Sequence, residues 1–146
     1  MESTELLVAV FVLLVMLFVG TVAHELAHAA VLRAFGVSYE IEWLPDRNSQ
    51  TVYNVGLGGT WATVTPRSIP RKMPAWVLRL SAIAPLVLAT PLLIAVVGVV
   101  PNPLDTENLV HVVFTVTWLG FALPSPRDFS LFWYAGRAIE TEGWHQ

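Results

Sequence analysis

The sequence predicts a polytopic α-helical membrane protein, because of its composition and its three long apolar segments. Hydrophobic residues make up 55% of the 146 residues and charged residues 13%, whereas soluble domains have roughly 45–50% and about 25%. Each segment holds about 18 or more mostly apolar residues, which is enough to cross a bilayer. The segments cover about residues 4–35, 74–100 and 108–139. We expect one transmembrane domain over residues 1–146, since the chain has no room for a separate soluble module.

Local signals set the limits of the three segments. The first ends at Gly36, a residue type that commonly terminates helices. The second contains Pro85 and Pro91, and each should kink it because proline has no N–H to donate in a helix. The third is interrupted by the sequence LPSPRD, so we expect a helix with an irregular break at residues 124–127.

The stretch between the first two segments has the alternation of a β-strand. In VSYEIEW (37–43) every second residue is apolar or aromatic, which is the period of a half-buried strand. TVYNVG (51–56) and TWATVT (60–65) are two further short strand candidates. We therefore predict a small β region at about residues 37–65, the alternative being a polar loop that alternates by chance.

The distribution of basic residues predicts the orientation. Four of them lie in the loop between the first two segments: Arg47, Arg67, Arg71 and Lys72. The segment before the first span and the loop 101–107 carry only acids. By the positive-inside rule the loop 36–73 and its β region are cytoplasmic. This predicts a multi-pass protein of the cell membrane with its amino terminus outside and its carboxyl terminus in the cytoplasm.

The charge and the cysteine count exclude other classes. The net charge is −3, with no basic stripe, which argues against nucleic acid as a partner. The chain has no cysteine, so it has neither disulfides nor thiolate metal ligands. Any metal must therefore be bound by histidine or by oxygen ligands.

The motif HELAH places His24, Glu25 and His28 inside an apolar segment. Ionisable groups there cost several kcal/mol unless they have partners, so they suggest a function. Residues four apart are separated by about 40° around a helix, so both imidazoles leave one face and can bind one ion. Glu25 lies beside that face, where a carboxylate can act as general base on a metal-bound water. The alternative, two buried histidines satisfied by carbonyls, does not explain the glutamate.

A catalytic zinc needs a third protein ligand and an open position. Asp128 follows the proline break and, with Glu25, is one of two acidic residues in apolar surroundings at transmembrane depth. Irregular backbone at that depth must be buried in protein or line a wet cavity. Asp128 could also be the N-cap of a helix over 129–139 or a partner of Arg127, and capping is compatible with metal binding. His111 is a weaker candidate, because it lies about 25 Å from Asp128 along a continuous helix.

With HExxH on its first segment and Pro-x-Pro-x-Asp on its last, the chain resembles the site-2 protease family of intramembrane zinc metalloproteases. The resemblance covers essentially the whole chain, from AHELAHA to LPSPRDFSLFWYAGRAI. It implies that Zn²⁺ is bound by His24, His28 and Asp128, and that Glu25 is catalytic.

The chain departs from the family pattern at four positions. The family's leucine and glycine around the aspartate are replaced by Arg127 and Phe129. Two family asparagines correspond to Gly120 and Leu88. These differences leave the ligand set intact and describe a minimal or divergent member.

The sequence thus predicts an intramembrane zinc metalloendopeptidase that hydrolyses membrane-embedded or membrane-proximal substrates near the cytoplasmic face. Its expected partners are a membrane protein or peptide substrate and the lipid bilayer, and its oligomeric state is left open. The alternative is a non-catalytic membrane protein whose metal is structural or serves ion binding or transport. The intact glutamate favours the enzyme.

A helical substrate shields its peptide bonds, so the substrate must be locally extended at the site. The strand 37–43 follows the metal-binding segment directly, and its edge could pair with an extended peptide by β-augmentation. We therefore expect substrate contacts from Tyr39, Ile41 and Trp43. Alternatively, the sheet only shields the cavity from lipid.

Overall fold

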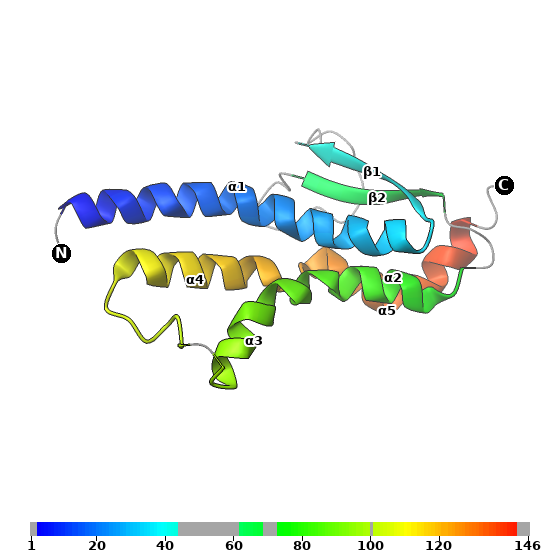
Figure 1. Cartoon of the computed structure of the whole chain (residues 1–146). Coiled ribbons are helices and arrows are strands. Elements are labelled where there is room, and N and C mark those ends of the chain that lie inside the picture. Colours follow the sequence, from blue (N-terminus) through cyan, green and yellow to red (C-terminus); the bar gives the residue numbers. More distant parts are fainter. Residues whose placement is uncertain (1–2, 44–61, 69–72, 100, 143–146) are drawn as a thin grey trace. The chain divides into compact units, whose positions relative to one another are not determined.

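The computed structural model describes residues 3–43, 62–68, 73–99 and 101–142. In these residues one long helix is followed by two strands and then by further helices, labelled in Figure 1 except for η1. In chain order they are α1 (Ser3–Ala34), β1 (Ser38–Trp43), β2 (Ala62–Ser68), α2 (Ala75–Ile83), the 3₁₀ helix η1 (Ala84–Ala89), α3 (Thr90–Val96), α4 (Leu109–Ala122) and α5 (Pro126–Glu142).

Three helical stretches are long and apolar enough to cross a membrane: Ser3–Ala34, Ala75–Val96 and Leu109–Glu140. They correspond to the three segments predicted from the sequence. The second is divided into α2, η1 and α3, with one of its two prolines inside η1 and the other at the start of α3. The third is broken, because α4 ends at Ala122 and Leu123 has extended backbone angles. Since α5 already begins at Pro126, the break lies slightly earlier than predicted.

Gly36 ends α1, as its position after the last apolar residue predicted. Its φ of 69° lies in the left-handed region that glycine adopts without steric cost. The N–H of Gly36 donates to the carbonyl of Arg33, and the N–H of Val37 donates to that of Leu32. This pair of bonds is the Schellman motif, and Val37 and Leu32 are both buried in the adjoining core.

The chain divides into two compact units, residues 1–24 with 85–123 and residues 25–84 with 124–146. Whether they make one domain, as the sequence predicted, stays a prediction. In the first unit α4 runs parallel to the first part of α1 (Figure 1). At one end, Oε1 of Glu5 accepts from the N–H of Leu109 at 3.3 Å. At the other, Gly20 lies directly against the ring of Phe121.

The second unit contains the end of α1, the two strands, α2 and α5. Helix α2 packs against α5. The buried core of the unit consists of Leu32, Val37, Met73, Val77, Leu78 and Ala135. They come from the end of α1, the connection after it, the residues just before α2, α2 itself and α5, so the core joins elements that are distant in the sequence.

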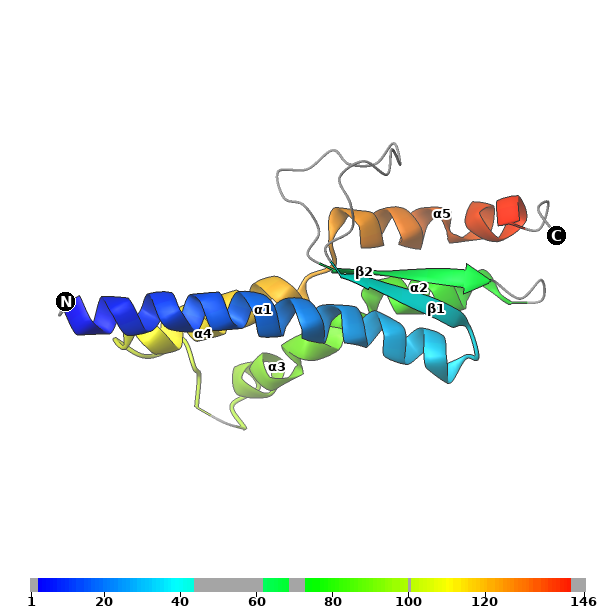
Figure 2. The same ribbon diagram turned by 90° about the horizontal axis from the view of Figure 1, so that it is seen from above.

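The strands β1 and β2 lie side by side as an antiparallel pair (Figure 2). In their register Ile41 lies opposite Val64. The N–H of Val64 donates to Glu25 of α1 and therefore points away from β1. Because the direction alternates along an antiparallel ladder, Ile41 and Val64 form a pair that is not hydrogen bonded. Pro66 lies two residues after Val64, so its backbone nitrogen also faces away from β1. Its missing N–H therefore removes no hydrogen bond between the strands.

The sequence predicted the position of β1 correctly but not all of its burial. Tyr39 and Ile41 are half-buried, as the alternation indicated, whereas Trp43 is 52% exposed. The candidate strand 60–65 corresponds to β2, which begins at Ala62 and continues to Ser68. The candidate strand 51–56 lies outside the described residues.

Candidate metal centre

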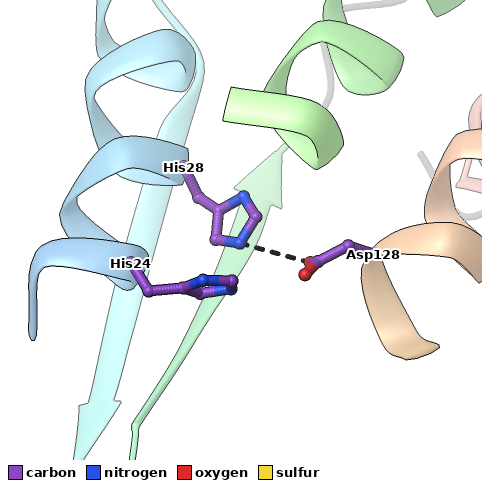
Figure 3. Close-up of side chains that lie close together, drawn as sticks. All are labelled: His24, His28 and Asp128. Atoms are coloured by element: carbon purple, nitrogen blue, oxygen red, sulfur yellow. Dashed lines mark ion pairs between the residues drawn. The ribbon is translucent and has the colours of Figure 1, made fainter. Parts of the chain in front are cut away.

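Helix α1 carries His24 and His28 one turn apart, and both side chains are buried. Figure 3 shows the two imidazole rings and the carboxylate of Asp128 directed toward one another. Each of the three residues offers one ligand atom such that these atoms all lie within 4.8 Å of one another. In the described part of the chain this is the one group of three or more histidine, cysteine or acidic side chains so arranged. The structure therefore brings together the three residues predicted as ligands.

The distances suit a small tetrahedral ion. With bonds of 2.0–2.1 Å and tetrahedral angles, two zinc ligand atoms lie roughly 3.3 Å apart. Nε2 of His28 lies 3.2 Å from Oδ1 of Asp128. Two imidazoles with one carboxylate are also a donor set that catalytic zinc sites use. The residues present therefore fit a zinc ion with one further position for water or substrate.

Each histidine is oriented by a backbone carbonyl from another helix. Nδ1 of His24 lies 2.7 Å from the carbonyl oxygen of Phe121 in α4. Nδ1 of His28 lies 2.8 Å from that of Ser81 in α2. Because a carbonyl only accepts, Nδ1 must carry the proton in both rings, and Nε2 is then the nitrogen that can bind a metal. The two hydrogen bonds thus set both the ring orientation and the tautomer that metal binding requires.

Asp128 is positioned by the first turn of α5. The N–H of Ser125 donates to Oδ2 of Asp128 at 2.6 Å, and the N–H of Asp128 donates to Oγ of Ser125 at 3.2 Å. This reciprocal pair is a capping box in which Ser125 is the N-cap. The suggestion that Asp128 itself caps a helix over 129–139 is therefore wrong, because α5 starts three residues earlier. The box engages Oδ2, while Oδ1 faces His28.

Glu25 lies outside the group of three and is half-buried. Its Oε2 accepts from the N–H of Val64 at 3.0 Å, which links α1 to β2. Glu25, the predicted general base, is thus hydrogen bonded to the edge of β2 that faces away from β1.

The remaining candidates lie apart from the group. Tyr39 packs against the buried core of its unit, and Trp43 is exposed. His111, the weaker candidate, is exposed near the start of α4 and does not belong to the group. His145 lies outside the described residues.

The residues that support the site were not identified from the sequence, although Ser125 and Gly20 could have been recognised from their sequence context. Ser125 and Asp128 have the serine-x-x-acid spacing of a capping box, directly after a proline break. Gly20 is an isolated glycine inside an apolar helical segment, one turn before His24, and a glycine there often has a packing reason. The carbonyls of Ser81 and Phe121 carried no such signal, because any residue has a carbonyl and only the fold selects these two.

An HExxH helix whose two histidines converge with a buried carboxylate has the arrangement of a zinc peptidase site. Residues 17–139 match the model of a family described as "putative zincin peptidase", and the chain belongs to this family. Zincins hold Zn²⁺, and the His24, His28 and Asp128 group could hold that ion. Comparisons with curated proteins and with solved structures gave no match.

Proposed function

We propose that the protein is an intramembrane zinc endopeptidase of the site-2 protease type. It hydrolyses peptide bonds of membrane-embedded or membrane-proximal substrates near the cytoplasmic face. The observation that carries the proposal is the convergence of His24, His28 and Asp128 within helices that are apolar enough to cross a membrane. Membership of a zinc peptidase family supports the reaction class.

The chain's own residues then have distinct roles. His24, His28 and Asp128 hold the ion, which when bound lowers the pKa of water and polarises a peptide carbonyl. Glu25 removes a proton from the water whose oxygen attacks the carbonyl carbon. As the C–N bond breaks, Glu25 returns that proton to the leaving amine. The hydrogen bond from the N–H of Val64 to Oε2 holds the carboxylate of Glu25 in place for this exchange.

The decisive experiment replaces the general base. Glu25→Gln keeps the size of the side chain and its acceptor for Val64, so purified protein should retain zinc, measured by elemental analysis. Cleavage of single-span test substrates in liposomes should fall to background. Retained cleavage would contradict the mechanism, and loss of zinc together with activity would indicate a structural role for Glu25.

The same assay addresses the non-catalytic alternative. A protein with a structural or transport metal would bind zinc in its unmodified form and cleave no member of a panel of membrane substrates. Zinc flux into liposomes would then distinguish transport from a structural site. The intact Glu25 beside the ligands favours hydrolysis, because a structural site has no use for a base.

We also propose that the substrate binds as an extended strand at the outer edge of β1. Since Ile41 forms a pair with Val64 that is not hydrogen bonded, its N–H points away from β2. Tyr39 and Trp43 lie two residues before and after Ile41, so their N–H groups also point away from β2. The three predicted substrate contacts are therefore also the residues whose N–H groups point outward.

Proline substitution tests this edge. Ile41→Pro removes an outward donor, and we expect at least a tenfold loss of cleavage with zinc content and thermal stability unchanged. Glu42→Pro is the matched control on the inner side, where loss of a bond to β2 should lower thermal stability first. Normal cleavage by a folded Ile41→Pro variant would show that β1 serves only as a shield.

The proposed orientation places the loop 36–73 in the cytoplasm and the loop 101–107 outside. The chain has no native cysteine, so single cysteines can be labelled without background. In intact cells, a membrane-impermeant maleimide should label Asp105→Cys, and it should label Ser38→Cys only after permeabilisation. The reverse pattern would invert the orientation without affecting the proposed chemistry.

A further inference from the structure

The carbonyl of Ser81 that orients His28 lies inside a helical stretch, where carbonyls ordinarily accept from the N–H four residues later. It accepts instead from Nδ1 of His28 at 2.8 Å and from the N–H of Ala84. The bond to Ala84 is of the 3₁₀ type and occupies one of the two lone pairs. The other lone pair is directed to the metal ligand.

The residue four positions after Ser81 is Pro85, which has no N–H. Its side chain is among the largest fully buried ones, and it lies within the 3₁₀ helix η1 that follows α2. A residue with an N–H at position 85 would be a regular helical donor to the carbonyl of Ser81. Pro85 therefore offers no N–H that could compete with His28 for the carbonyl of Ser81. The helical stretch nevertheless continues through η1 into α3.

We propose that Pro85 is a positioning residue for the metal centre, which by withholding an N–H reserves the carbonyl of Ser81 for Nδ1 of His28. The inference rests on the proposed zinc site but not on the peptidase reaction. According to this inference, a proline on a different helix determines the tautomer and the ring orientation of His28.

A second proline in the same span has a different environment. Pro91 leaves the carbonyl of Val87 without its regular helical donor, in the same way that Pro85 does for Ser81. That carbonyl accepts from the hydroxyl of Thr90 at 2.6 Å, a contact within its own turn. The missing N–H of Pro91 therefore affects a hydrogen bond within the same turn and not the metal centre. This makes Pro91 a matched control.

The test measures zinc affinity of the purified chain in detergent by competition with a chelator, without any substrate. In Pro85→Ala the new N–H competes for the carbonyl of Ser81, and we expect affinity to fall about 10–100-fold, the usual effect of losing a ligand's supporting partner. Pro91→Ala should stay within about twofold of the unmodified protein, because the carbonyl of Val87 keeps Thr90. Equal affinities for the unmodified and the Pro85→Ala proteins would overturn the inference.

A rescue separates the missing N–H from the shape of the proline ring. Lactic acid introduced at position 85 gives an ester that lacks both the ring and the N–H, and it should restore most of the zinc affinity. If the ester is as weak as Pro85→Ala, the ring and not the absent donor supports the site, and the inference is wrong.

A spectroscopic readout addresses His28 itself. In the metal-free protein, ¹⁵N NMR of labelled histidines should show His28 with its proton on Nδ1, and Pro85→Ala should shift it toward a mixture of tautomers. An unchanged His28 signal in Pro85→Ala would contradict the inference. Failure of the unmodified chain to bind zinc would instead contradict the proposed function, so the two failures are distinguishable.

Discussion

The two histidines of the proposed metal site, His24 and His28, are oriented by the same kind of hydrogen bond, but the accepting carbonyls arise in different ways. Both donate Nδ1 to a carbonyl at nearly equal distances, 2.7 and 2.8 Å. For His28 that carbonyl lies inside a continuing span, at Ser81. For His24 it lies at the end of α4, at Phe121, just before the backbone leaves the helix at Leu123. One support therefore depends on a proline within a helix, and the other on the place where a helix stops.

The surroundings of the two ligands differ as well. His28 faces Oδ1 of Asp128, which the capping box of α5 holds in place. His24 depends on the close approach of α4 to α1 at Gly20, where a Cβ would lie only 2.5 Å from Cγ of Phe121. The comparison teaches that a metal site can be stabilised by local capping on one side and by helix packing on the other.

The largest effect should come from removing a ligand. His24→Ala and His28→Ala should each lower zinc affinity by more than the 10–100-fold that loss of a supporting partner typically costs. The double variant should contain no zinc by elemental analysis. Full zinc occupancy in the double variant would place the site elsewhere and remove the basis of the comparison.

Adding a methyl group at Gly20 should affect the His24 side alone. Gly20→Ala forces Phe121 away from α1, so its carbonyl moves from Nδ1 of His24, and we expect about a tenfold loss of zinc affinity. The double variant Gly20→Ala/Phe121→Val keeps the carbonyl and relieves the clash, so it should recover affinity. A lack of recovery would mean that Gly20 does not act through Phe121.

A smaller effect is expected from the capping box on the His28 side. Ser125→Ala removes the acceptor for the N–H of Asp128, and loss of an N-cap costs about 1 kcal/mol of stability. Thermal unfolding should show this loss, and zinc affinity should fall by less than in Gly20→Ala. Ser125→Thr keeps a hydroxyl and should behave like the unmodified protein. If Ser125→Ala lowers zinc affinity more than Gly20→Ala does, local capping outweighs helix packing in holding the site.

The smallest effect should come from Ser81→Ala. The hydroxyl of Ser81 donates to the carbonyl of His28 at 3.4 Å, which is long for such a bond. The backbone carbonyl that orients His28 is unaffected by the substitution. Because the bond is long, we expect a loss of stability at the low end of the roughly 0.5–1.5 kcal/mol that a hydrogen bond contributes, and unaltered zinc affinity. A marked loss of zinc would show that the side chain, not the backbone, supports His28.

The three residues that the structure brings together could be predicted from sequence because their polar chemistry conflicts with their apolar surroundings. His24, His28 and Asp128 are polar residues in apolar segments, and the helical period fixes which of them share a face. Gly36 and the proline break likewise act through their own backbone. The start of α5 was placed incorrectly because Asp128 was considered as the cap, although Ser125 has the better spacing.

The supporting carbonyls could not be predicted from sequence for a physical reason. Every residue has a carbonyl, and only the packing of α2 and α4 against α1 selects those of Ser81 and Phe121. The exposure of Trp43 was missed for the same reason, since alternation assigns a side to each residue but cannot say how far the covering elements extend. The strand candidate over 51–56 lies outside the described residues and stays a prediction.

The unbroken course of α1 has a consequence for the second reactant of hydrolysis, which is water. Oε1 of Glu5 accepts from the N–H of Leu109 at the start of α4. His24 follows 19 residues later on the same helix, which at 1.5 Å per residue is about 28 Å along the axis. A bilayer's hydrocarbon core is about 30 Å thick. If the protein spans the membrane as proposed, with Glu5 at one surface, His24 would lie near the opposite surface, where water is available to the proposed site.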